Sequence, residues 1–172
     1  MYIVLMAMLA LNVSSDVLKG FSLIGDSLKR TTGNAMKENA ALYADFESAY
    51  KSNPTKVKPW YDKAMEVKRM SDSLYTLAGD LRLAIAREAD GKDADPDNLQ
   101  NKEDLEGSNR IMLAPARGKG KQLYDAINNF RTRILALVTD PRQRAIIASN
   151  LSTDVPKSED NVGKNWQQYM FE

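Results

Sequence analysis

Residues Met1–Leu28 read MYIVLMAMLALNVSSDVLKGFSLIGDSL, and among the first thirteen of them only Asn12 is frankly polar. No charged residue appears before Asp16. Thirteen helical residues span about 20 Å, whereas the hydrocarbon core of a membrane is roughly 30 Å thick. The pattern therefore predicts that residues 1–13 are the second half of a transmembrane helix, truncated at its N-terminal side.

Two other interpretations of this apolar run remain open. A buried core helix would have similar hydropathy, but an uncharged run at a terminus, followed by an amphipathic stretch, is unusual for one. A signal peptide would need a positively charged start, which Met1-Tyr2-Ile3 lacks.

The apolar pattern continues past the run at helical spacing, and no proline interrupts residues 1–30. We therefore expect one helix, whose segment 14–30 leaves the bilayer and continues into water. A single membrane helix with such a stripe covers its apolar side chains more easily by pairing with a second copy than on its own. The sequence thus predicts a dimer seam formed by Val13, Val17, Phe21 (or Leu18), Ile24 and Leu28. The alternative is that the stripe packs on the downstream domain.

The composition of the 172 residues excludes several classes of function. Lys and Arg total 24 against 23 Asp and Glu, a balance that argues against a general nucleic-acid binder. The chain has no histidine and no cysteine. Ordinary zinc sites, histidine-dependent nucleophilic catalysis and disulfide-bonded folds are therefore excluded, and we expect no cofactor.

Residues 31–172 are predicted to form an all-α helical bundle, truncated at its C-terminal side. Apolar residues recur at helical spacing through most of this segment, and none alternates with the period of a strand. Prolines predict a helix end at Asn53-Pro54 and helix starts at Pro59 and Pro141. The expected helices are Ala35–Tyr50, Pro59 to just before Gly91, Lys119–Val138 and Pro141–Leu151, with a short helix around Asn101–Glu106.

Few residues suggest chemistry. Asp93, Asp95 and Asp97 alternate as in a calcium loop, but the glycine and glutamate that such a loop needs are absent, so a solvated acidic loop is expected. The run Arg117–Lys121 (RGKGK) lacks the spacing of a phosphate-binding loop and predicts a flexible basic turn. Solvated faces and local salt bridges are the expectation for Arg131, Arg133, Arg142 and Arg144, and bundle anchors for Trp60, Tyr61 and Trp166. No catalytic or metal-binding residue is predicted.

Four segments resemble the GldM/PorM family. Met1–Leu28 resembles the family's membrane helix and its continuation, and the matching parts of its first periplasmic domain are LRLAIAREADGKDA (Leu81–Ala94), IMLAPARGKGKQL (Ile111–Leu123) and KNWQQYMFE (Lys164–Glu172). The family's proteins are subunits of the inner-membrane motor of type IX secretion and gliding motility. The resemblance implies a non-enzymatic, single-pass protein of the bacterial inner membrane, with most of the chain in the periplasm.

The resemblance also implies partners. The expected ones are a second copy of the chain, a surrounding ring of GldL/PorL membrane subunits, the lipid bilayer and, for the full-length protein, the GldK–GldN (PorK–PorN) assembly at the outer membrane. Tyr2 matches the tyrosine of the family's M-Y-[IL]-V motif. Because a phenol in hydrocarbon needs a hydrogen-bond partner, we expect Tyr2 to contact an ionisable group of the membrane partner, although a packing or interfacial role is an equal alternative.

Two rival functions remain at this point. A membrane helix that continues into a periplasmic bundle also describes the sensor domain of a chemoreceptor, which would have a pocket with convergent polar groups. A soluble periplasmic adaptor, released by signal cleavage after about Ser14, is the other.

Overall fold

The computed structural model describes residues 2–102, 104, 106–115 and 118–172, with the side chains of residues 2–18 and 21 excepted. Throughout this part of the chain the regular structure is helical, which confirms the predicted all-α class. No described helix is both long and apolar enough to cross a membrane. The helices are α1 (Tyr2–Ser52), α2 (Pro54–Asp90), α3 (Gly107–Met112), α4 (Gly120–Leu137), α5 (Pro141–Asn150), the 3-10 turn η1 (Glu159–Asn161) and α6 (Trp166–Phe171).

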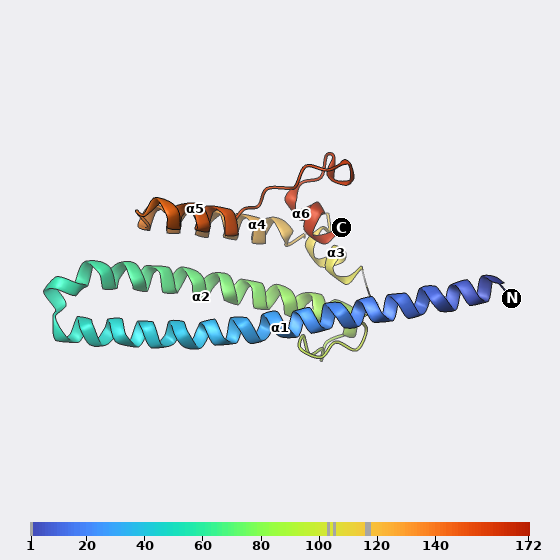
Figure 1. Cartoon of the computed structure of the whole chain (residues 1–172), viewed down its shortest axis with the longest axis horizontal. Helices are drawn as coiled ribbons and strands as arrows, with labels where there is room; N and C mark the ends of the chain where they lie inside the picture. Colours follow the sequence, from blue (N-terminus) through green and yellow to red (C-terminus); the bar gives the residue numbers. More distant parts are fainter. Residues whose placement is uncertain (1, 103, 105, 116–117) are drawn as a thin grey trace. The chain divides into compact units, whose positions relative to one another are not determined.

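Helix α1 belongs to the first of two compact units, Met1–Tyr61, and it is longer than predicted. The sequence predicts separate helices over residues 1–30 and 35–50, whereas the structure joins them into 51 helical residues, about 76 Å long (Figure 1). The join is possible because no proline intervenes. The Thr31 hydroxyl donates to the Ser27 carbonyl oxygen at 3.0 Å, so this polar side chain is accommodated inside the helix.

A single residue, Asn53, separates α1 from α2. Its side-chain oxygen accepts a hydrogen bond from the Lys56 backbone N–H at 3.2 Å, and Pro54 occupies the first helical position. The predicted end at Asn53-Pro54 is therefore confirmed, but the predicted start at Pro59 is wrong, since Asn53 and Pro54 already supply a helix start five residues earlier. Beside this turn, Tyr50 and Tyr61 stack with ring centroids 4.5 Å apart.

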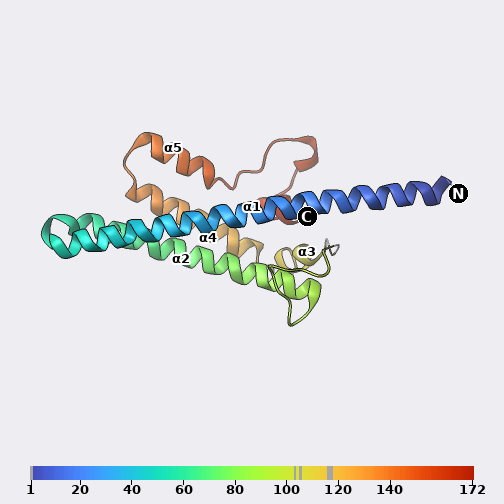
Figure 2. The same ribbon diagram turned by 60° about the horizontal axis from the view of Figure 1, so that its bottom comes forward.

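The second unit, Asp62–Glu172, contains most of α2 and all of α3–α6. Within it, α4 packs against α5 and α6, and α3 packs against α4 and α6 (Figures 1 and 2). Trp166 of α6 is buried, 5.7 Å from the Tyr124 ring and 6.0 Å from the Phe171 ring. The prediction that Trp166 anchors the bundle is confirmed. Trp60, by contrast, is 65% exposed, so its predicted role as an anchor is wrong.

Acidic side chains shape the loop between α2 and α3. The Asp90 carboxylate accepts the backbone N–H groups of Gln100 and Asn101, both at 2.7 Å, and this closes the loop onto the end of α2. The short helix expected around Asn101–Glu106 is displaced to Gly107–Met112, because Asp90 holds the start of the expected segment in a non-helical conformation; residues 103 and 105 lie outside the description.

The loop at Asp93–Asp97 was expected to be a solvated acidic loop, but two of its three carboxylates form contacts. Asp95 accepts the Asp97 backbone N–H at 2.9 Å, and Asp97 forms an ion pair with Arg82 of α2. Two of the three carboxylates therefore fold the loop and attach it to α2.

The basic turn before α4 also differs from its expectation. A Cβ added at Gly118 would lie 2.7 Å from the Met112 carbonyl oxygen and 2.9 Å from that of Ala114, and one at Gly120 would lie 2.9 Å from the Met112 oxygen. The Gly118 N–H donates to the Ala114 oxygen at 2.7 Å. This half of the predicted flexible turn is closely packed on the end of α3, whereas Arg117 lies outside the description.

Candidate functional site

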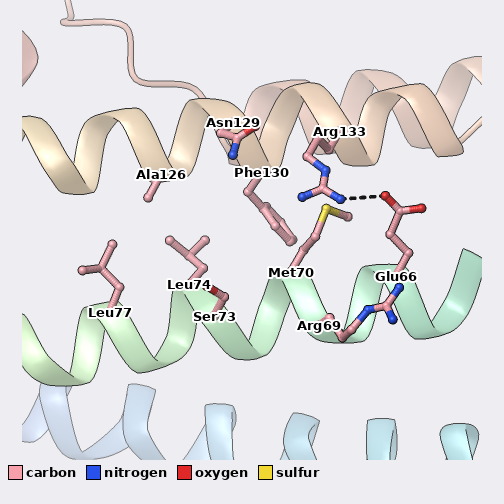
Figure 3. A pocket seen from close by; sticks show the side chains of 10 residues that line it. All are labelled: Glu66, Arg69, Met70, Ser73, Leu74, Leu77, Ala126, Asn129, Phe130 and Arg133. Atoms are coloured by element: carbon pink, nitrogen blue, oxygen red, sulfur yellow. Dashed lines mark hydrogen bonds and ion pairs between the residues drawn. The ribbon is translucent and has the colours of Figure 1, made fainter.

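A groove of about 260 Å³ runs between α2 and α4, inside the second unit (Figure 3). Residues from α2 line one side and residues from α4 the other. The lining residues are Glu66, Arg69, Met70, Ser73, Leu74 and Leu77 from α2, and Ala126, Asn129, Phe130 and Arg133 from α4.

The floor of the groove is apolar. Met70 is buried, with 9% of its surface exposed, and it points toward Phe130 across the groove (Figure 3). Further along, Leu74 and Leu77 face the small side chain of Ala126, which fills less space than the residues around it (Figure 3). The groove therefore exists because residue 126 is an alanine, whose methyl group does not fill the space opposite Leu74 and Leu77.

The rim of the groove is polar and carries a net positive charge. Arg133 donates to Glu66 at 2.8 Å, and both side chains are partly exposed, so solvent screens this ion pair. Arg69 has no carboxylate within ion-pair distance in the described part of the chain. Two arginines and one glutamate thus leave one uncompensated positive charge beside the apolar floor.

The groove is not predicted by the sequence. Met70, Leu74 and Leu77 lie at helical spacing within the predicted helix that begins at Pro59, but their position opposite α4 depends on tertiary structure. The helical spacing of Glu66, Arg69 and Ser73 along one side of these residues was the available signal for a polar rim.

Solvated faces and local salt bridges were expected for Arg131, Arg133, Arg142 and Arg144, and two of these arginines have partners among the described residues. Arg133 of α4 forms an ion pair with Glu66 of α2, so a salt bridge is present, but it joins two helices instead of being local. Arg144 donates to the carbonyl oxygens of Leu135 and, at 2.9 Å, Val138, so it satisfies the C-terminal end of α4.

A second candidate surface lies on α1, in the other unit. The predicted seam residues Ile24 and Leu28 are 57% and 62% exposed, on one face one helical turn apart. The side chains of Tyr2, Val13, Val17 and Phe21 lie outside the description, so the structure does not test their predicted roles. Other large apolar residues of α1 are also exposed, namely Leu23, Met36, Leu42 and Phe46.

A cluster of charges ties α3 to the end of α2. Arg110 donates to Glu88 and to Asp104, both at 2.6 Å. The hydrogen bond from Arg110 holds the pKa of Asp104 below its usual value, and the carboxylates of Glu88 and Asp104 raise the pKa of Arg110. These groups are engaged with one another, and we assign them a structural role.

The described side chains contain no group of three or more His, Cys, Asp or Glu residues that could hold a metal ion. The groove and the exposed face of α1 are candidate recognition surfaces.

The family described as the GldM N-terminal domain matches residues 16–172, nearly the whole chain. No curated protein sequence matches this chain.

Proposed function

The chain belongs to the GldM family, and from this premise we propose that it carries the N-terminal domain of a non-enzymatic inner-membrane motor subunit. The subunit would use the proton-motive force to transmit mechanical work across the periplasm, for type IX protein secretion and gliding motility. Its partners would be a second copy, the GldL/PorL membrane subunits and, through the rest of the full-length protein, the GldK–GldN (PorK–PorN) assembly.

The observation that carries this proposal is the continuity of α1. Its 51 residues form one helix from the apolar start of the chain to the Ser52–Asn53 turn. A continuous helix resists bending because every turn is tied to the next by backbone hydrogen bonds. Rotation imposed at its membrane end would therefore reach the turn about 76 Å away.

The exposed apolar residues of α1 support self-association. Ile24 and Leu28 face solvent over more than half of their surfaces, although burying such side chains is favourable by about 1.5–3 kcal/mol each. A second copy aligned in parallel would cover both residues. The full seam that we propose comprises Val13, Val17, Phe21, Ile24 and Leu28.

The membrane end would supply the driving force. A proton that crosses the membrane releases about 2.3 kcal/mol per 100 mV, so several protons must act together against a load. We propose that titration of a partner carboxylate changes its contact with the paired helices, and that Tyr2 lies at this contact.

Cysteine cross-linking tests the dimer, because residues 1–172 contain no cysteine that would compete with an introduced thiol. We expect Ile24→Cys in the full-length protein to form a disulfide-linked dimer in membranes, and Val17→Cys to do the same. Asp26→Cys is the matched control, because Asp26 lies two residues away and on the other side of the helix. Monomer alone from both seam positions would refute the paired helices.

The chemoreceptor-type sensor remains a second candidate, because the α2–α4 groove combines polar rim groups with an apolar floor. A sensor would bind a small ligand in this groove, and the ligand would raise the unfolding temperature of the wild-type domain. A domain with Ala126→Leu, which fills the groove, would not respond.

A further inference from the structure

The proposed seam on α1 cannot continue along the whole helix. Two parallel helices pair through positions spaced alternately by four and three residues, and from Val17 this spacing reaches Glu38, Leu42 and Asp45, so that two carboxylates flank the leucine. In a parallel pair each position faces its own copy, so Glu38 would face Glu38 and Asp45 would face Asp45. Like charges in such a contact are destabilising, and the helix-to-helix seam must therefore end before residue 38.

The apolar face of α1 nevertheless continues past this point. Leu42 and Phe46 follow Ile24 and Leu28 by 18 residues, which is five full turns, so the two pairs share one side of the helix. Leu42 is 59% exposed and Phe46 is 38% exposed. This side of α1 faces the second copy in the proposed dimer, but beyond residue 38 it needs a surface other than an identical helix.

Charge indicates which surface would fit. Glu38 and Asp45 flank the apolar pair on one side of α1, and neither has a cation within ion-pair distance in the described part of the chain. The α2–α4 groove offers the complement, since its floor is apolar and Arg69 on its rim has no carboxylate partner in the same set of residues (Figure 3).

We propose that the α2–α4 groove of each copy receives the Glu38–Phe46 segment of α1 from the second copy. Leu42 lies over Ala126 and Ser73, and Asp45 pairs with Arg69, which makes the incoming helix antiparallel to α2. This inference rests on the proposed dimer and deepens it: the dimer contact passes from α1 against α1 to α1 against the partner's groove.

Disulfide formation between two differently tagged copies tests the arrangement in the full-length protein. One copy carries Leu42→Cys and the other Ala126→Cys, and a bond requires Cα atoms about 4.4–6.8 Å apart. We expect a product that carries both tags. Lys37→Cys in place of Leu42→Cys is the matched control, since Lys37 lies on the opposite side of α1, and it should give none.

The ion pair provides an independent test. Asp45→Lys should lower the yield of the mixed Leu42→Cys/Ala126→Cys product by about two- to fivefold, as expected for an exposed pair. Adding Arg69→Glu to the copy with Ala126→Cys should restore the yield, whereas adding Arg131→Glu, which lies outside the groove, should not.

The outcomes separate this inference from the dimer itself. If Ile24→Cys gives dimers and the mixed pair gives none, the groove assignment is wrong and the dimer stands. If Leu42→Cys and Ala126→Cys bond only when both are in the same copy, the groove belongs to the chain's own α1, and the proposal is overturned. If Ile24→Cys also fails, the dimer and the groove contact fall together.

Discussion

At the scale of single residues, small side chains and carboxylates determine the local geometry of the second unit. Gly118 is the clearest case, because the two carbonyl oxygens nearest to its missing Cβ are backbone atoms, which cannot rotate away. Its requirement for glycine is steric and could not be predicted from the RGKGK run, in which glycine is equally compatible with a flexible turn.

Gly118→Ala is therefore expected to destabilise the domain by about 1–3 kcal/mol, the usual cost of forcing a methyl group into a packed site. Gly79→Ala is the matched control, since Gly79 is inside α2 and a Cβ there meets no atom within 4 Å. That change should stabilise α2 by roughly 0.5–1 kcal/mol. Urea unfolding measures both, and equal stability of the two variants would contradict the packing argument.

Asp104 gives the domain a pH-dependent contact. Because Arg110 holds the pKa of Asp104 below the ordinary value of 3.8, the contact stabilises the fold fully above that value. The stabilisation disappears as the pH falls through the lowered pKa. Asp104→Asn should therefore unfold at a lower urea concentration than wild type at pH 7, and the difference should shrink below about pH 4.

Asp93→Asn serves as the control for this pH profile, because Asp93 is a neighbouring loop carboxylate whose side chain forms no described contact. Its stability should follow that of the wild type across the whole pH range. A difference between Asp104→Asn and wild type that persists unchanged at pH 3 would show that the carboxylate's charge is not what matters.

At the scale of elements, the sequence predicts helices well and helix boundaries unevenly. The start of α5 was predicted correctly, because Asp140 accepts the Gln143 N–H at 2.9 Å and Pro141 follows it, and both signals are local. The length of α1 was underestimated, because Thr31 and Gly33 weaken a helix without ending it. The groove was missed because it depends on which residue of α4 faces Leu74, a tertiary relation that periodicity within one helix does not contain.

Helix α6 depends on a capping box. Asn165 accepts the Gln168 N–H at 2.9 Å, and the Gln168 side chain accepts the Asn165 N–H at 3.0 Å. Because α6 has only six residues and carries the buried Trp166, Asn165→Ala should cost about 1 kcal/mol and loosen that indole. The fluorescence of Trp166, measured in a Trp60→Phe background, should shift toward that of an exposed indole.

Asn165→Asp is the control for the cap, since aspartate keeps the accepting oxygen at the same position. Its fluorescence and stability should remain close to those of the wild type. If the alanine variant also remained unchanged, the cap would not determine how α6 is held.

At the scale of the whole molecule, the proposed motor function requires α1 to behave as one stiff element. The second unit has no such requirement, so a change that bends α1 should impair the motor without unfolding the second unit.

Ala35→Pro tests this requirement, because a proline inside a helix removes a backbone hydrogen bond and bends the helix, at a cost of about 3 kcal/mol. Residue 35 precedes the segment that we assign to the groove and follows Ile24 and Leu28, so the seam below it can still pair. We expect Ala35→Pro to abolish type IX secretion while the Ile24→Cys cross-link and the urea unfolding of the second unit are retained. Ala35→Ser, which keeps the backbone hydrogen bond, should secrete normally. Normal secretion by the proline variant would mean that torque does not pass along α1, and a soluble or sensory role would then fit the chain better than a lever.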